Sequence, residues 1–265
     1  MYLQHFGLKH APLGKNSPSL WMSKDLESFQ ESFNNLLHNP GIGLLYGESG
    51  VGKTAALRHI TKAINPHQYE VFYIAETQFT CFDIYRQLAW NLGLIPSNRY
   101  AQLWRDIKNH IRERVDNKRS RPVFIIDEAQ ALKPDFFSSF PSFLNFGFDA
   151  RDMIIVWFVG HPVLAKIIDR VAYTALASRI QVRHQFHPIT DRESFEKLVL
   201  HAFKEAGCQS KLLSDSGMEL LRVASQGRIR GAHHILVGTM EIACKKGLNH
   251  LPDDIIQEAI EKLKG

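Results

Sequence analysis

The feature that most constrains the fold is a short apolar run that leads straight into a glycine-rich octapeptide. Residues 41–46 have the composition of a buried strand, and residues 55–64 have helical composition. Between them lies Gly47-Glu48-Ser49-Gly50-Val51-Gly52-Lys53-Thr54, which fits the pattern Gly-x-x-x-x-Gly-Lys-[Ser/Thr] at every fixed position. The order of strand, glycine loop and helix is the context in which this pattern binds phosphate. The sequence therefore predicts an α/β fold whose first strand ends in a nucleotide-binding loop.

The residue types of this octapeptide match the chemistry of a bound nucleoside triphosphate. Its three glycines let the backbone curl so that successive N–H groups point at phosphate oxygens, and the following helix adds its positive end. Lys53 is expected to reach the β- and γ-phosphates, while the Thr54 hydroxyl ligates Mg²⁺. We predict that the whole loop, residues 47–54, holds ATP. Glu48 and Ser49 occupy variable positions, and their side chains are assigned no chemistry of their own.

Two acidic residues follow a later strand. A second strand is predicted over residues 71–76 and a third over 123–126, which is followed directly by Asp127 and Glu128. In this setting Asp127 would hold Mg²⁺ through its water shell, and Glu128 would orient and polarise the attacking water. The structural alternative is that Asp127 caps the segment that follows it.

The remaining elements complete an α/β domain and add a helical one. A fourth strand, residues 153–159, runs into His161, which is either a candidate sensor of the γ-phosphate or a turn histidine before a proline. Residues 176–186 read as a helix end that passes into a fifth strand. After a boundary near residue 187 only helical patterns follow, at residues 191–206, 215–225, 230–246 and 252–264.

Composition excludes several classes of protein. The longest uncharged apolar run, residues 153–160, is far shorter than the roughly 20 residues that span a bilayer, and the N-terminus lacks a signal pattern. The three cysteines have wide spacings and no Cys-x-x-Cys pair, which supports neither a disulfide framework nor a cysteine zinc site. We therefore expect a soluble cytoplasmic protein without a membrane partner.

Positive charge is concentrated in one segment. The net charge of the chain is +5, and residues 99–121 alone hold eight basic and three acidic residues. Arg105, Lys108 and Arg112 are spaced by three and four, so on a helix they share one face, whereas Trp104, Ile107 and Ile111 would pack on the core. The segment is either a stripe that binds a polyanion or a solvated helix face with internal ion pairs. The candidate contacts to DNA phosphates are Arg105, Lys108, Arg112, Lys118 and Arg119.

Together these features resemble the layout of AAA+ ATPases over nearly the whole chain. The shared features are the phosphate loop, the strand that ends in Asp-Glu, a polar residue after the next strand, Ser-Arg before the last strand, and a helical lid. Residues 2–9 and the stretch Asp127-Glu128-Ala129-Gln130 look like one branch of that class. This branch holds the general secretion pathway A ATPases and the ATP-dependent helpers of bacterial transposons, of the TnsC, TniB and IstB type.

The resemblance assigns roles to further residues. Arg179 is expected to be the arginine finger that reaches the γ-phosphate in a neighbouring subunit, with Arg183 as the second candidate. Arg230 is expected to be the sensor arginine of the lid, with Arg228, two residues earlier, as the alternative. His161 stands where glutamine or asparagine is more usual in the branch.

The resemblance also implies an architecture. It predicts a nucleotide-binding domain over residues 20–187, with a parallel five-stranded sheet flanked by helices, and an all-helical lid domain over residues 188–265. Residues 1–19 are expected to pack on the domain edge or on a neighbouring subunit.

The leading functional hypothesis is a Mg²⁺-dependent ATPase that oligomerises on duplex DNA as a ring or helical filament. It would recruit a DDE transposase for target selection, with a target-selection protein as a second candidate partner. This choice depends on the chain ending after its last lid helix, where the secretion ATPases continue into a membrane anchor. The alternative is a secretion-type assembly ATPase that binds no DNA. A switch that binds ATP but barely hydrolyses it is disfavoured by Glu128.

Overall fold

The computed structural model describes residues 2–117, 120–147, 151–208 and 210–264. By its contacts the chain divides into two compact units, which we describe separately. The sheet unit comprises residues 27–47 and 60–185. The helical unit comprises residues 1–26, 48–59 and 186–265. The phosphate loop that follows the first strand therefore shares its contacts mainly with the C-terminal helices.

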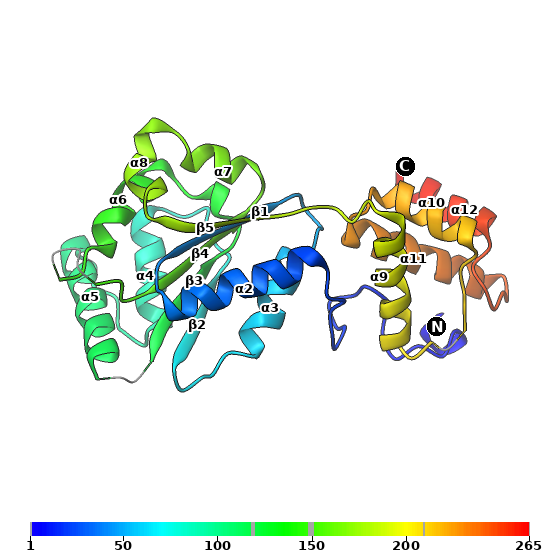
Figure 1. Ribbon diagram of the computed structural model, residues 1–265, viewed down its shortest axis with the longest axis horizontal. Coiled ribbons are helices and arrows are strands. Elements are labelled where there is room, and N and C mark those ends of the chain that lie inside the picture. Colours follow the sequence, from blue (N-terminus) through cyan, green and yellow to red (C-terminus); the bar gives the residue numbers. More distant parts are fainter. Residues whose placement is uncertain (1, 118–119, 148–150, 209, 265) are drawn as a thin grey trace. The chain divides into compact units, whose positions relative to one another are not determined.

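Five strands form one sheet in the order β2-β3-β4-β1-β5 (Figure 1). They are β1 (Ile42–Gly47), β2 (Tyr69–Ile74), β3 (Arg121–Ile126), β4 (Ile155–Gly160) and β5 (Ile180–Phe186). The pairs β1·β4, β2·β3 and β3·β4 are parallel, with Tyr46 opposite Gly160 and Ile126 opposite Phe158. Because the strands are parallel, the carboxyl ends of β1, β3 and β4 meet at the same edge of the sheet. The α/β fold with a parallel five-stranded sheet is as predicted.

Helices cover both faces of the sheet, which explains why its three central strands, β1, β3 and β4, are almost continuously buried. On one face Phe124, Val156 and Phe158 belong to a core shared with α4 (Cys81–Asn91), α5 (Tyr100–Asp116) and α6 (Pro134–Leu144). On the other face Trp157 stacks on Phe33 of α2 (Lys24–His38), with 5.4 Å between ring centroids. A Cβ on Gly43 would lie 2.5 Å from the Trp157 ring, so the glycine makes room for the indole. The sheet unit also contains α7 (Val163–Ile168), α8 (Thr174–Ala177) and the short 3₁₀ helices η1 (Ala129–Ala131) and η2 (Val171–Tyr173).

The helical unit is built around four helices of the C-terminal part of the chain. These are α9 (Arg192–Glu205), α10 (Asp215–Ser225), α11 (Ile229–Lys245) and α12 (Asp253–Lys264), and each lies within one residue of its predicted bounds. The N-terminal segment, with the short helix α1 (Tyr2–His5), joins the same core through the buried side chains of Phe6 and Leu8. The Lys9 N–H also donates to the Ala206 carbonyl, at 2.8 Å. The unit is completed by the phosphate loop and the first part of α3 (Lys53–Lys62).

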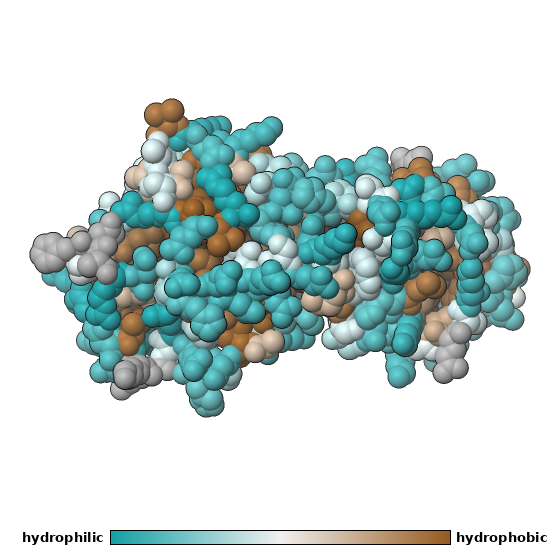
Figure 2. Space-filling model, in the orientation of Figure 1, coloured by the Kyte–Doolittle hydropathy of each residue, from teal (hydrophilic) through white to brown (hydrophobic). Residues whose placement is uncertain are grey.

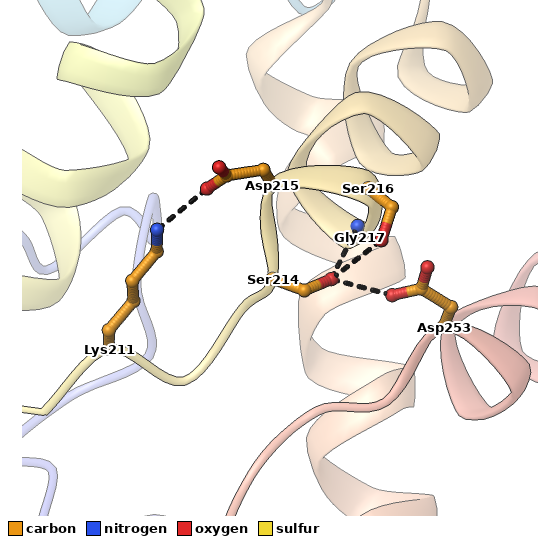
Figure 3. Close-up of polar contacts among 6 residues, drawn as sticks. All are labelled: Lys211, Ser214, Asp215, Ser216, Gly217 and Asp253. Carbon is orange, nitrogen blue, oxygen red and sulfur yellow. Dashed lines mark hydrogen bonds and ion pairs between the residues drawn. The ribbon is translucent and has the colours of Figure 1, made fainter.

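The starts of α10 and α12 are held together by one serine (Figure 3). The Ser214 hydroxyl accepts from the Gly217 N–H at 2.8 Å, as the N-cap of α10, and donates to Asp253 Oδ1 at 2.7 Å. Lys211 forms an ion pair with Asp215 in the first turn of α10, at 2.6 Å. These bonds fix the N-terminal ends of two helices relative to one another within the helical unit.

The visible surface is mainly hydrophilic, with apolar side chains exposed in small groups (Figure 2). Ile95 and Val171 are the most exposed of the large apolar side chains in the described part of the chain. Within the described ranges, no helix combines the length and the apolar composition needed to cross a membrane.

Candidate active site

The phosphate loop has the backbone that its glycines predict. Gly50 and Gly52 have φ values of +81° and +103°, in the left-handed region that side chains disfavour. The loop turns back on itself, so that Lys53 Nζ donates to the Glu48 carbonyl at 2.9 Å. The Lys53 side chain is buried. A buried ammonium directed at an oxygen of its own loop is consistent with a site for an anion with several oxygens.

Two arginines at the start of α11 contact this loop. Arg230 donates through its backbone N–H to the Gly50 carbonyl at 3.1 Å, and through Nη1 to Ser49 Oγ at 3.0 Å. Arg228 forms an ion pair with the Glu48 carboxylate at 2.7 Å. Both candidates for the sensor arginine therefore lie at the loop with different partners. Sequence reasoning placed Glu48 and Ser49 in the ATP-binding loop but gave their side chains no chemistry, because nothing local in the sequence indicates a partner so distant along the chain.

The first acidic residue after β3 is held at both carboxylate oxygens. Asp127 is buried, its Oδ2 accepts from the Tyr73 hydroxyl at 2.6 Å, and its Oδ1 accepts from the Glu128 N–H at 2.9 Å. Burial, together with this bond to Asp127, raises the pKa of Tyr73 far above its usual value, so the hydroxyl remains a donor. The N-cap residue of η1 is Glu128, and its own side chain makes no capping bond.

Glu128 adopts an uncommon backbone conformation. Its φ and ψ are 51° and 35°, in the left-handed region that non-glycine residues enter at an energetic cost. Its carbonyl accepts from the buried Thr77 hydroxyl at 2.9 Å, and its Oε2 accepts from Gln130 Nε2 at 2.5 Å. Gln130 Oε1 in turn accepts from the His161 N–H at 3.1 Å. Thus His161 joins the cluster through its backbone, whereas sequence reasoning proposed it as a side-chain sensor and gave Thr77 and Gln130 no role.

Both candidate arginine fingers have partners within the chain. Arg179 donates to the Ala175 carbonyl at 3.0 Å and to Asn145 Oδ1 at 3.2 Å. Arg183 forms an ion pair with Asp169 at 2.7 Å. Their reach into a neighbouring subunit stays a prediction.

The basic segment forms α5, and its apolar face packs as predicted. Ile107 and Ile111 are fully buried, and Trp104 packs against the same core. Arg105 and Arg112 are exposed. Lys108 is different, because its Nζ donates to the Asn145 carbonyl at 2.6 Å and lies 4.7 Å from the centroid of the Phe146 ring.

The surroundings of the basic side chains limit the proposed stripe. Burial, and then the charge of Arg112, lower the pKa of Lys108, whose side chain is turned towards the protein. Arg114 pairs with Glu70. Lys118 and Arg119 lie outside the described residues. Among the described candidates, therefore, Arg105 and Arg112 are the exposed ones.

The geometry agrees with comparisons to known proteins. Residues 36–168, half of the chain, match the AAA domain family, and the chain belongs to this family. Proteins with this domain are ATPases that generally bind ATP and Mg²⁺, and oligomerisation is typical of them.

Two relatives resemble nearly the whole chain in sequence. General secretion pathway protein A of Aeromonas hydrophila is 26% identical over 92% of this chain and 48% of its own length. The chain thus spans about half of that protein. A potential ATP-binding protein of Staphylococcus aureus is 23% identical over 91% of this chain and 95% of its own.

Solved structures share the fold. Cdc6p of Pyrobaculum aerophilum aligns with a TM-score of 0.71 and 20% identity over 97% of this chain and 70% of its own. The ORC1 protein of Aeropyrum pernix, solved in complex with DNA, aligns with a TM-score of 0.70 and 15% identity over 95% of this chain and 68% of its own. The RuvB branch migration motor of Thermotoga maritima aligns with a TM-score of 0.61 and 15% identity over 93% of this chain and 72% of its own. The predicted AAA+ fold is therefore confirmed.

Proposed function

We propose that the protein is a Mg²⁺-dependent ATPase that hydrolyses ATP to ADP and phosphate. The observation that carries this proposal is the acidic pair after β3, in a chain whose phosphate loop has its left-handed glycines and its buried lysine. Asp127 is a buried carboxylate held by a tyrosine, and the next residue, Glu128, is held in a strained conformation by hydrogen bonds to its backbone and to its carboxylate. Strain of this kind persists where the surroundings fix a functional group.

The residues present fit ATP and Mg²⁺. Lys53 already donates to a loop oxygen, and a phosphate would give its ammonium a stronger acceptor. Thr54 and Asp127 supply the hydroxyl and carboxylate oxygens that Mg²⁺ prefers. Bound Mg²⁺ neutralises charge on the phosphates. Glu128 would orient the attacking water, with His161 beside it and Arg230 as the sensor arginine.

This proposal is tested with two substitutions. Glu128→Gln should leave ATP binding intact and lower turnover by about 100-fold or more, because the amide cannot accept the proton of the water. Lys53→Ala should weaken binding itself, by removing charge from the phosphates. Phosphate release measures turnover, and titration with a fluorescent ATP analogue measures binding. Parental turnover by Glu128→Gln would contradict the role of Glu128.

For the cellular role, we propose an assembly ATPase of the secretion type that acts as a homo-oligomer and does not bind DNA. Its support is the 26% identity with general secretion pathway protein A over 92% of this chain. The second candidate is a DNA-bound helper that recruits a transposase. The observation that favours it is the exposure of Arg105 and Arg112 on the solvent face of α5.

Duplex DNA binding at increasing salt, with a non-hydrolysable ATP analogue present, separates the two candidates. If the DNA candidate holds, Arg105→Gln/Arg112→Gln should weaken binding to unrelated sequences and flatten the log–log salt slope by up to roughly 2 units per subunit. Lys166→Gln/Arg170→Gln removes the same charge from exposed positions elsewhere and is the matched control. Failure of the parent to bind DNA at low salt would leave the secretion-type role.

A further inference from the structure

Gln130 links the ends of two neighbouring strands. It lies on η1, just after β3, and its amide contacts Glu128 on one side and the backbone that follows β4 on the other. The orientation of the amide is determined by chemistry, because the His161 N–H is a donor and must face the oxygen. The amide nitrogen is thereby left to donate to the Glu128 carboxylate, at 2.5 Å.

Gly160 provides the space for this amide. It is the last residue of β4, and a Cβ at this position would overlap Gln130 Oε1 and come within 3.0 Å of Leu164 Cδ2. Gly160 is not among the glycines with a positive φ, so its backbone does not require glycine. Glycine is needed at position 160 for packing instead, because the Gln130 amide occupies the space that a side chain would fill.

The bond from Gln130 acts on the part of Glu128 that would do chemistry. The Asp127 and Thr77 bonds hold the backbone of Glu128, whereas Gln130 holds its carboxylate. Glu128 is an exposed residue, and an exposed carboxylate samples several rotamers unless a partner restricts it.

We propose that Gln130 is a positioning residue that fixes the Glu128 carboxylate and ties it to the end of β4 at His161. This inference rests on the proposed function, in which Glu128 orients the attacking water. We therefore expect substitution of Gln130 to lower the turnover of ATP and to leave the affinity for ATP unchanged.

The first test is Gln130→Met, which keeps the length of the side chain and removes both hydrogen bonds. We expect kcat to fall about 10- to 150-fold, the range of one hydrogen bond to a charged group, with KM for ATP and binding of the analogue unchanged. Gln130→Met leaves Gly160 intact and provides a test that does not depend on whether Gly160 tolerates substitution.

The second test approaches the amide from the other side. Gly160→Ala should displace the Gln130 amide and lower kcat in the same way. In a Gln130→Ala background the overlap with the amide is gone and the close neighbour that remains is the end of the Leu164 side chain, at 3.0 Å, so Gly160→Ala should cause little further loss of kcat. Such non-additivity is the signature of residues that act through one contact. Gly238→Ala is the matched control, because a Cβ there meets nothing closer than Ala259 Cβ at 3.6 Å.

The outcomes separate this inference from the proposed function. Absence of ATPase activity in the parent, or parental kcat in Glu128→Gln, overturns the proposed function. Loss of activity in Glu128→Gln with parental kcat in Gln130→Met overturns the positioning role alone. Additive losses of kcat from Gly160→Ala and Gln130→Ala also overturn it. A rise in KM for ATP equal to the fall in kcat/KM, with kcat retained, would place Gln130 in nucleotide binding instead.

Discussion

At the scale of single residues, the bond between Tyr73 and Asp127 joins two neighbouring strands at the candidate site. Its donor is a half-exposed tyrosine on β2, and its acceptor is a buried carboxylate directly after β3. Hydrogen bonds to charged groups contribute more than bonds between neutral groups. We therefore expect this hydroxyl to stabilise the sheet unit measurably.

Tyr73→Phe should lower the free energy of unfolding by about 1.5–3 kcal/mol, because Asp127 loses a donor. Tyr69→Phe, on the same strand, is the control, since its hydroxyl donates to the neutral Leu37 carbonyl at 2.9 Å and should cost about 0.5–1.5 kcal/mol. Denaturant unfolding followed by tryptophan fluorescence measures both, and Trp157 in the sheet core is one reporter. An equal loss in the two variants would contradict a charge-assisted bond.

The sequence predicted some members of the candidate site and not others, for a physical reason. Lys53, Asp127 and Glu128 belong to patterns that are local in sequence, so they can be recognised before the strand order is known. Tyr73 reaches Asp127 because β2 and β3 are neighbours, and Gln130 reaches the backbone of His161 because β3 and β4 are neighbours. Strand order is set by packing of the whole sheet, and nothing in the residues around position 73 indicates it.

At the scale of elements, an ion-pair cluster joins α12 to the end of α11. Glu258 pairs with Lys246 at 2.8 Å and with Lys262 at 2.7 Å, and these bonds lower its pKa to about 2. A lowered pKa in the folded state contributes stability that is present above the unfolded value and is lost as pH falls towards the folded one. The contribution is therefore complete above about pH 5 and disappears near pH 2.

Lys246→Gln should accordingly be less stable than the parent at neutral pH, and the difference should shrink between pH 5 and pH 2. Because these groups are exposed, the difference should also shrink in high salt. Lys245→Gln removes the same charge one residue earlier and should not show this pH dependence. Denaturant midpoints followed by far-UV circular dichroism provide the measurement. If the difference in stability between Lys246→Gln and the parent stays constant down to pH 2, the ion pair with Glu258 is not its cause.

Secondary structure was predictable where apolar residues repeat at the spacing of one kind of element. The helices α9 to α12 have regular apolar spacing, and their predicted bounds differ from the structure by at most one residue. The predicted fourth strand began at residue 153, but β4 begins at Ile155, since Met153 and Ile154 are buried without joining the ladder. A run of apolar residues shows that a segment is buried, but it does not show which of its residues pair with a neighbouring strand. The helix α6 had no counterpart among the predicted elements; Pro141 lies inside it and phenylalanines are frequent in its sequence, and neither feature is typical of a helix.

At the scale of the whole molecule, the arginine finger decides whether one chain holds a complete site. Arg179→Ala should depress ATPase activity, by less than the roughly 10³-fold at the lower end of known arginine fingers. Mixing it with Glu128→Gln should restore part of the activity, because each subunit then supplies the part that the other lacks. Phosphate release across mixing ratios and protein concentrations measures this effect.

The same mixtures made with Arg183→Ala identify which arginine acts as the finger. Loss of activity in that variant alone would assign the role to Arg183, whose partner in this chain is Asp169. Activity that is independent of protein concentration, with no loss in either variant, would mean that the site is complete within one subunit.

The ion pair between Glu48 and Arg228 has a consequence for how such chains evolve. The phosphate-loop pattern allows any residue at position 48. The constraint on this position comes instead from its ion pair with Arg228, just before α11. A lineage that loses the acid at position 48 relaxes selection on the arginine, and a reversal of charge at one position selects for a reversal at the other. We therefore expect the residues at positions 48 and 228 to change together among related chains.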